Sequence, residues 1–312
     1  MCTAVSWKSK DHYFGRTLDL EYSLGEQVII TPRYYPLTFR HLPVQKCHYA
    51  MIGMAVIHEG SALYFDAVNE MGLGIAALNF PGCAHYRPFD PKSINVPSYE
   101  VIPWILSQCA SLAETRELLL KCNITNEAFN ANFPTTPLHW LIASEDESMV
   151  LESVSGGIHL HKASGVLTNA PEYPRQIAIL NAFQNLTSHS SRDVRGSGSL
   201  GLPGDLTSQG RFVRAAFMKR HSVTPSSEAD AVEQFFHLMD GVSQPEGCVV
   251  LPNEKLVCTR YTCCCNADMG IYYYVTHTNR RINAVDLHRT DLKGQHLICY
   301  PLQLKADFRK QN

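Results

Sequence analysis

The first 80 residues of the chain alternate short apolar runs with turn-forming residues. The runs are rich in β-branched and aromatic residues, and turn signals such as Glu59-Gly60 and Met71-Gly72 separate them. This pattern is typical of strands. It predicts strands over residues 3–7, 13–20, 27–31, 49–57, 64–69 and 74–80. We therefore expect this part of the chain to form layered sheet.

From residue 98 to residue 122 the apolar positions recur at helical spacing. Val101 and Ile105 lie on an apolar face, and Ser111 is well placed as the N-cap of a helix over residues 112–121. Further strands are predicted over 138–144, 149–153, 157–161, 257–266, 270–276, 282–286 and 297–301, helices over 176–184, 211–220 and 228–239, and a glycine-rich loop over 196–204. Runs of strands that alternate with runs of helices indicate an α+β protein with stacked sheets and outer helices. Since no internal repeat or linker divides the sequence, residues 1–312 are interpreted as one domain.

Composition and charge exclude several kinds of partner. The chain has 312 residues, 45% of them hydrophobic, and a net charge of -2. Such a balance provides no basic field for nucleic acid or anionic lipid. No apolar run approaches the roughly 20 residues that a bilayer requires, and residues 1–11 are too polar for a secretory signal. We expect a cytoplasmic protein with no nucleic-acid partner and no membrane insertion.

Eleven cysteines raise the questions of disulfides and of metal. Because the count is odd and no export signal is predicted, we expect reduced thiols. Cys258 and the run Cys263-Cys264-Cys265 suggest a zinc site, but adjacent strand residues point to opposite faces, and no second paired element accompanies them. The favoured interpretation is small buried side chains in a strand, without metal.

Cys2, directly after Met1, is the first candidate for chemistry. The initiator methionine is normally removed when the next side chain is small, which would leave Cys2 with a thiol and a free α-amino group. Such groups titrate within about one pH unit of each other, so the amine can accept the thiol proton without a separate histidine. The pattern favours N-terminal nucleophile amide hydrolysis. The alternative is a cysteine without function, because thiol reactivity depends on surroundings.

A thiolate that attacks an amide needs a group to hold the amine, a positive charge near the sulfur, and donors for the oxyanion. Arg16 and Asp19 lie three residues apart at the end of an apolar strand. At that spacing they project to opposite faces, so they can share one site only if the strand ends or bends between them. The alternative is a surface ion pair.

Two asparagines and two arginines extend the set of candidates. Asn79 closes the apolar run 74–78 and Asn169 closes the run 165–168, so each is either an oxyanion donor or the cap of a turn. Arg211 and Arg214 follow the glycine-rich loop on one helical face, where solvent exposure would be ordinary. Spacing alone does not bring these residues into one site.

Eight short motifs occur in order between residue 1 and about residue 290. They are Met1-Cys2-Thr3; Phe14-Gly15-Arg16 with Asp19 and Glu21; Asn69-Glu70 with Gly72-Leu73-Gly74; Leu78-Asn79-Phe80-Pro81; Leu138-His139-Trp140; Val166-Leu167-Thr168-Asn169 with Pro171; Gly201-Leu202-Pro203-Gly204-Asp205; and Gly270-Ile271-Tyr272-Tyr273-Tyr274. The ordered set resembles the choloylglycine hydrolase family, which comprises bile salt hydrolases and penicillin V acylases. The resemblance implies the four-layer αββα sandwich of N-terminal nucleophile hydrolases and a homotetramer.

The same resemblance implies roles for the residues around the thiol. Cys2 would be the nucleophile and its α-amine the base, after removal of Met1. Asp19 would hold that amine, and Arg16 would lie beside the sulfur.

The resemblance also implies how the oxyanion is held. Asn169 and the backbone N–H of Asn79 would form the oxyanion hole, with Arg211 as further polar support. Bile salt hydrolases typically have asparagine at the position of Asn79, whereas penicillin-preferring relatives often have tyrosine, so this chain resembles the former.

The family's apolar pocket positions correspond to Leu18, Phe129, Phe133 and Leu138, which suit the flat face of a steroid. The alternative is ordinary core packing, for Leu138 above all. This chain also departs from the family at His58, where many members carry an aromatic residue in a pocket loop.

The predicted function is hydrolysis of the amide between a bile acid and glycine or taurine, through a thioester on Cys2 and without metal or organic cofactor. Interception of that thioester by another amine is chemically possible. The alternatives are a penicillin V acylase, another N-acyl amide hydrolase such as one that acts on acyl-homoserine lactones, and a catalytically silent steroid- or lipid-binding protein.

Overall fold

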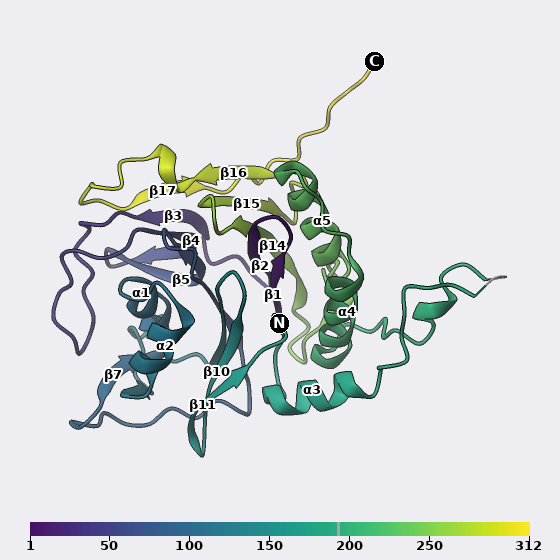
Figure 1. Ribbon diagram of the computed structural model, residues 1–312. Coiled ribbons are helices and arrows are strands. Elements are labelled where there is room, and N and C mark those ends of the chain that lie inside the picture. The colour runs from purple at the N-terminus through teal and green to yellow at the C-terminus, as the bar shows by residue number, and fades with distance from the viewer. Residues whose placement is uncertain (192–193) are drawn as a thin grey trace.

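The computed structural model describes residues 1–191 and 194–312, which build four layers in the order helices, sheet, sheet, helices (Figure 1). We call the two central layers sheet A and sheet B. The order of strands in sheet A is β12, β1, β2, β14, β15 and β16, with β13 paired to β14. Their bounds are β1 Cys2–Lys8, β2 His12–Leu20, β12 Val166–Leu167, β13 Val249–Val250, β14 Leu256–Asn266, β15 Ile271–Thr276 and β16 Asn283–Asp286.

Sheet B runs in the order β11, β10, β9, β6, β5, β4, β3 and β17. Its strands are β3 Gln27–Thr31, β4 Met51–His58, β5 Ser61–Asn69, β6 Gly74–Asn79, β9 Leu138–Ala143, β10 Ser148–Val154, β11 Gly157–Lys162 and β17 Ile298–Pro301. A separate parallel pair joins β7 Ile94–Pro97 to β8 Cys122–Thr125.

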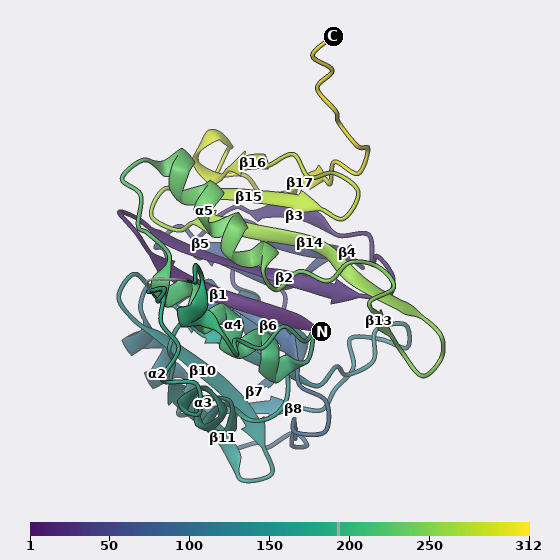
Figure 2. The same ribbon diagram turned by 90° about the vertical axis from the view of Figure 1, so that its right-hand side faces the viewer.

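Helices cover the outer face of each sheet. Sheet B is covered by α1 Val101–Leu106, with α2 Leu112–Leu119 beside it, and sheet A by α4 Ser208–His221 and α5 Glu228–Asp240 (Figures 1 and 2). Helix α3 Tyr173–Asn181 packs against α4. Short 3-10 turns lie at Ser98–Glu100, Ser197–Ser199 and Leu287–Arg289. Within the described residues, no helix has both the length and the apolar character needed to cross a membrane.

The central core forms where the two sheets face each other. Phe14, Val68, Leu141 and Tyr261 are buried there. At Gly74 the sheets approach so closely that a Cβ atom would lie 2.8 Å from the ring of Phe14. Glycine is therefore required at this point, because any side chain would push the sheets apart.

The predicted α+β class and αββα sandwich are confirmed, and most predicted elements appear within a few residues of their expected bounds. Ser111 caps α2 as predicted, because its Oγ accepts the N–H of Glu114 at 3.2 Å. Cys263, Cys264 and Cys265 are buried side chains in β14, also as predicted.

Three details of the predicted elements are wrong. Residue 122 does not continue the helical region, because Cys122 begins β8 and pairs with Ile94 of β7. The third predicted helix lies earlier, at Tyr173–Asn181, since Pro174 suits a first helical turn. The short strands β7, β8, β12 and β13 were not predicted, because their partners rather than their own sequences define them.

Candidate active site

Cys2 is the first residue of β1, which lies between β12 and β2. Cys2 pairs with Leu18 of β2, and it is only 3% exposed. The sulfur points toward sheet B, whereas the backbone of Cys2 faces α4 on the other side of sheet A. The sulfur and the backbone of Cys2 therefore lie in two different environments.

Arg16 lies on the sulfur side of Cys2. Its Nη2 donates to Cys2 Sγ at 2.5 Å, and its Nη1 donates to the carbonyls of Phe65 and Ala77 in sheet B. Burial alone would lower the pKa of Arg16, but Cys2, Tyr261 and Asp66 outweigh burial and hold that pKa above its ordinary value. A permanent positive charge beside a thiol favours the thiolate, which is the nucleophilic form.

Asp66 of β5 is a buried carboxylate near Arg16 that the sequence analysis missed. The hydroxyls of Tyr261 and Tyr272 each donate to it at 2.6 Å. Burial raises the pKa of Asp66, although Arg16 opposes this shift. The signal for this residue was an acidic side chain within an otherwise apolar strand, a place where carboxylates are rare unless paired.

Asp19 lies on the opposite face of β2. Its Oδ1 accepts the hydroxyl of Thr259 at 2.7 Å, its Oδ2 accepts Nε2 of Gln244 at 3.2 Å, and Arg211 Nη1 lies 4.0 Å from Oδ2. Strand β2 does not end before Asp19, because it continues to Leu20. Its pairing with β14 shifts register between Thr259 and Tyr261, the partners of Asp19 and Leu18. Arg16 contacts the sulfur of Cys2, whereas Asp19 is connected to the backbone of Cys2 through Arg211, which donates to the Cys2 carbonyl. Neither Arg16 nor Asp19 is exposed, so the surface ion pair is excluded.

Arg211, in the first turn of α4, connects the backbone side of Cys2 to Asn169. Its Nη1 donates to the Cys2 carbonyl at 2.5 Å and to Thr3 Oγ1 at 2.6 Å, and its Nη2 donates to Asn169 Oδ1 at 2.8 Å. Burial lowers the pKa of Arg211, with Asp19 opposing the shift. Ordinary solvent exposure is therefore wrong for this residue. Arg214 is buried too, but it donates to the carbonyls of Pro203, Asp205 and Gly241.

Asn169 follows β12 and joins β1 to sheet B. Its Oδ1 accepts the N–H of Cys2 at 2.8 Å, and its Nδ2 donates to the carbonyl of Asn79, the last residue of β6, at 2.7 Å. The side chain of Asn169 therefore does not merely cap its own turn. Asn79 lines a pocket beside Cys2, and among the described residues no partner is present for its Oδ1.

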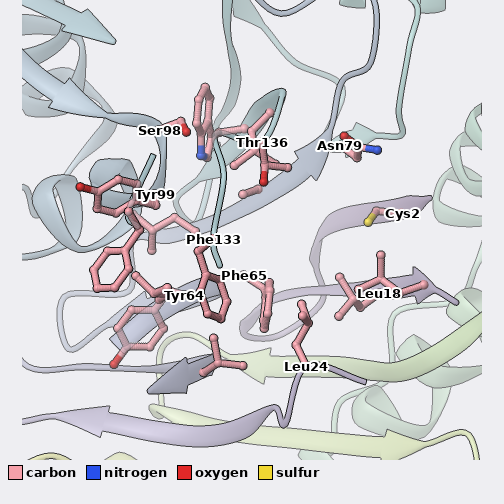
Figure 3. Close-up of a pocket in the computed structure, with 18 of the residues that line it drawn as sticks. Cys2, Leu18, Leu24, Tyr64, Phe65, Asn79, Ser98, Tyr99, Phe133 and Thr136 are labelled. Atoms are coloured by element: carbon pink, nitrogen blue, oxygen red, sulfur yellow. The ribbon is translucent and has the colours of Figure 1, made fainter. Parts of the chain in front are cut away.

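A pocket of about 260 Å³ opens at Cys2 and extends between the sheets and the loops around them (Figure 3). Figure 3 shows Cys2, Asn79 and Leu18 at one end and Tyr64 and Tyr99 at the other, with Phe65 and Phe133 between. All four predicted pocket residues line it. The sequence analysis did not predict the other pocket residues, which include Leu20, Tyr22, Leu24, Val56, Leu63, Phe65, Ser98, Ile102, Pro134, Thr136 and Trp140.

Leu138 and His58, which the sequence analysis also discussed, need a more exact description. Leu138 lines the pocket and also packs against the core beneath α1, so both interpretations of it hold. His58 packs with its ring centroid 4.4 Å from that of Phe133 and 5.8 Å from that of Phe129. It therefore supports these two rings of the pocket wall.

Comparison with known proteins agrees with this geometry. Residues 2–300 match the family described as linear amide C-N hydrolases, choloylglycine hydrolase family. The chain is 42% identical to a bile salt hydrolase/transferase of Lactiplantibacillus plantarum over 100% of both chains, and 32% identical to one of Clostridium perfringens over 96% of both.

Solved structures give the same answer for the fold. A mutant of the conjugated bile acid hydrolase from Clostridium perfringens superposes over 100% of both chains with a TM-score of 0.93 at 31% identity. A penicillin V acylase from Agrobacterium tumefaciens, 19% identical, has a TM-score of 0.80 over 98% of this chain and 94% of its own, and so shares the fold. This chain belongs to the choloylglycine hydrolase family of linear amide C–N hydrolases.

Proposed function

We propose that the protein is a bile salt hydrolase, which cleaves the amide between a steroid acid and glycine or taurine. The observation that carries this proposal is the apolar pocket that begins at the sulfur of Cys2. A flat steroid can bury its faces against such a wall while its amide lies at the thiol. The names of the relatives at 42% and 32% identity support the same substrate class.

In the proposed first step Cys2 attacks the amide carbonyl of the substrate. Removal of Met1 turns the backbone nitrogen of Cys2, now 2.8 Å from Asn169 Oδ1, into a free α-amine. This amine takes the thiol proton, while Arg16 stabilises the thiolate. Asp19 and Arg211 lie on the amine side of the residue, where Asp19 supplies the negative charge that favours an ammonium.

The proposed oxyanion hole consists of Asn169 Nδ2 and the backbone N–H of Asn79. Asn169 is held for this role because Cys2 and Arg211 both donate to its Oδ1. One N–H of its amide donates to the Asn79 carbonyl, so the other is free to meet the oxyanion. The α-ammonium then protonates the departing glycine or taurine. Water, activated by the same amine, releases the bile acid from the thioester, and another amine could intercept it in place of water.

Hydrolysis of glycocholate, taurocholate and penicillin V, measured side by side, tests the proposal. A bile salt hydrolase should turn over the two steroid conjugates with the higher kcat/KM. A preference for penicillin V would replace the proposed substrate while leaving amide hydrolysis in place. No turnover of any amide by a sample whose mass proves the loss of Met1 would favour the silent binding protein instead.

Assembly and location are further parts of the proposal. We propose one catalytic domain over residues 1–312 that acts in the cytoplasm as a homotetramer, as the family resemblance implies. The mass in solution from light scattering tests the assembly, and cell fractionation tests the location.

A further inference from the structure

His139, in the motif Leu138-His139-Trp140, has no role in the proposed mechanism, yet its ring lies between the two segments that carry the oxyanion donors. The residue belongs to β9 and is fully buried. Its backbone pairs with Leu78, next to Asn79 in β6. Its side chain reaches the other way, to the end of β12.

The first contact of the ring fixes the peptide unit before Asn169. His139 Nε2 donates to the carbonyl of Thr168 at 2.7 Å. The N–H of the same peptide unit, which belongs to Asn169, donates to Ser208 Oγ at 3.0 Å. A peptide unit held at both its oxygen and its nitrogen is restrained against rotation, so the backbone from which the Asn169 side chain projects is held in place.

The second contact of the ring fixes the segment that contains Asn79. The His139 ring stacks on Phe80, with centroids 4.1 Å apart and planes 9° apart. Phe80 directly follows Asn79, and its N–H donates to the Pro137 carbonyl at 2.8 Å. One imidazole therefore contacts both strand ends that provide the oxyanion donors.

Glu152 of β10 holds this imidazole from behind. Glu152 Oε1 lies 3.2 Å from His139 Nδ1 and accepts the N–H of Tyr173 at 2.9 Å. Because a carbonyl oxygen only accepts, Nε2 must carry the hydrogen of the bond to Thr168. The contact between Nδ1 and Glu152 holds the other side of the ring, so the imidazole is restrained at both its nitrogens.

The same carboxylate reaches Asn169 by a second route. Tyr173, whose N–H it accepts, begins α3, and Gln176 in that helix donates to the carbonyl of Asn169 at 2.6 Å. His161 Nε2 lies 3.4 Å from the other oxygen of Glu152. Glu152 is therefore connected to the backbone on both sides of Asn169.

We infer that His139 and Glu152 are positioning residues that hold Asn169 and Asn79 in the geometry needed to stabilise the oxyanion. This inference rests on the proposed function, because it takes the oxyanion roles of both asparagines from it. Donors in such a site act only when they are fixed at hydrogen-bond distance from the place where charge develops. An internal hydrogen bond adds little net stability, so the distinctive effect of these two residues is expected on rate.

The test compares His139→Gln with His12→Gln. His12 is also fully buried in a strand, and its ring contacts Ser6 Oγ rather than the oxyanion segments. His139→Gln should lower kcat for glycocholate on the order of 10- to 100-fold, with KM changed less than about threefold, because only part of an oxyanion contribution is lost. His12→Gln should leave kcat within about threefold. Equal losses in both variants would overturn the inference.

A double variant tests whether His139 acts through Asn169. In an Asn169→Ala background the His139→Gln change should lower kcat less than about threefold, since residues that act as one unit are not additive. A full multiplicative loss in the double variant would overturn the inference.

Hydrogen exchange tests the positioning without any substrate. Backbone amides over residues 166–170 should exchange at least about fivefold faster in His139→Gln than in wild type, and at the wild-type rate in His12→Gln. Unchanged exchange would overturn the inference, even if the wild type does not hydrolyse bile salts and the proposed function fails. If His139→Gln does not fold, Glu152→Gln takes its place in the measurements of kcat and of amide exchange. We then expect smaller changes in the same direction. Unchanged values of both would refute the inference.

Discussion

The catalytic cluster around Cys2 and the distant wall of its pocket are built by different means. The cluster is made of buried side chains that project from β2 (Arg16 and Asp19) and from α4 (Arg211). Each of these side chains hydrogen-bonds to another buried residue, respectively Cys2, Thr259 and Asn169. The wall around Phe129 and Phe133 comes from a loop, is half-exposed, and is held mainly by aromatic contacts. The cluster is thus directional and rigid, whereas the wall offers apolar area of adaptable shape.

The two regions differ in the treatment of buried charge as well. In the cluster every charge named above has a partner of opposite sign or several donors. Behind the wall, Glu100 lines a second cavity together with Tyr99 and Phe129. Its Oε2 is buried without a partner among the described residues, although Oε1 accepts the N–H of Arg40 at 2.9 Å. This difference predicts that changes in the cluster act on kcat, and that changes in the wall act on stability and on the choice of substrate.

Loss of the nucleophile should give the largest effect in the molecule. Cys2→Ala removes the thiol and its hydrogen bond from Arg16, but it keeps the hydrogen bonds of the Cys2 backbone to Asn169 and Arg211. Release of glycine from glycocholate should therefore be abolished, while the thermal unfolding midpoint stays close to that of wild type. Cys109→Ala, at another buried cysteine, should remain active and serves as the control. Met1 retained in a fully active sample, by intact-protein mass, would refute the amine-base mechanism.

Loss of the oxyanion donor should give the next largest effect. Asn169→Ala should lower kcat on the order of 10²- to 10³-fold and raise KM far less, because the lost hydrogen bond forms mainly in the transition state. Asn123→Ala is the matched control, since Asn123 is also buried but donates to Pro88 and Asn95. An unchanged kcat in Asn169→Ala would return Asn169 to a structural role.

The buried carboxylate of Glu100, behind the wall, should make the stability of the protein depend on pH. Burial raises the pKa of Glu100 from 4.5 to about 7, so the folded state favours the protonated form. The contribution of Glu100 to the free energy of unfolding is therefore complete below about pH 4.5, and it is lost as the pH rises through about 7. The loss amounts to roughly 3 kcal/mol for a shift of this size.

Glu100→Gln removes that titration. Relative to wild type, the free energy of unfolding of this variant, from urea titrations between pH 5 and 8, should rise by about that amount across the range. Glu117→Gln, at an exposed residue of α2, should show no such trend. If the difference in free energy of unfolding between Glu100→Gln and wild type does not change with pH, Glu100 is as well paired as the charges of the cluster.

The charge of Asp19 should have a smaller effect on rate. Asp19→Asn removes a negative charge that favours the ammonium form, but Gln244 Oε1, buried without a partner among the described residues, can turn to accept the new amide. We expect kcat to fall on the order of tenfold, and the acid limb of the pH–rate profile to move to lower pH, because the amine then loses its proton more easily. A pH profile equal to that of wild type would exclude the role of Asp19 at the amine.

The sequence predicted much more of the cluster than of the wall. Strand periodicity gave the sheets because side chains alternate between a core and a helix layer, and ordered motifs placed Cys2, Arg16, Asp19 and Asn169. The sequence correctly predicted that Arg16 and Asp19 project to opposite faces of β2. It did not predict that Arg16 would lie on the sulfur side of Cys2 and Asp19 on the backbone side. Nothing local indicates that one residue presents its sulfur to one side of a sheet and its backbone to the other.

The wall could be predicted only in part, because its residues converge from elements far apart in the chain. Tyr64, Ser98 and Tyr99 meet at the far end of the pocket through packing that no local pattern records (Figure 3). Asp66 was missed for a related reason. Its carboxylate is stabilised by hydrogen bonds from Tyr261 and Tyr272, which lie in the other sheet and far away in the sequence. Local patterns fix elements and motifs, whereas long-range contacts decide which side chains meet.

The smallest effect on rate is expected in the wall, at Phe129. Its ring meets Tyr99 edge-on at 5.3 Å between centroids, and Arg40 Nη2 donates to its carbonyl at 2.9 Å, so the loop should stay in place after truncation. Phe129→Ala removes apolar area worth roughly 1 kcal/mol at about 25 cal/mol per Å², or about fivefold in KM for a steroid conjugate that covers it. Penicillin V presents a smaller apolar group and should lose less, with kcat for both substrates nearly unchanged. Phe217→Ala, on the far side of sheet A, should change neither KM and controls for general effects on folding. Equal losses on both substrates, or a fall in kcat as large as that of the Asp19 variant, would mean that wall and cluster are not separate in function, and the division between rate and substrate choice would have to be abandoned.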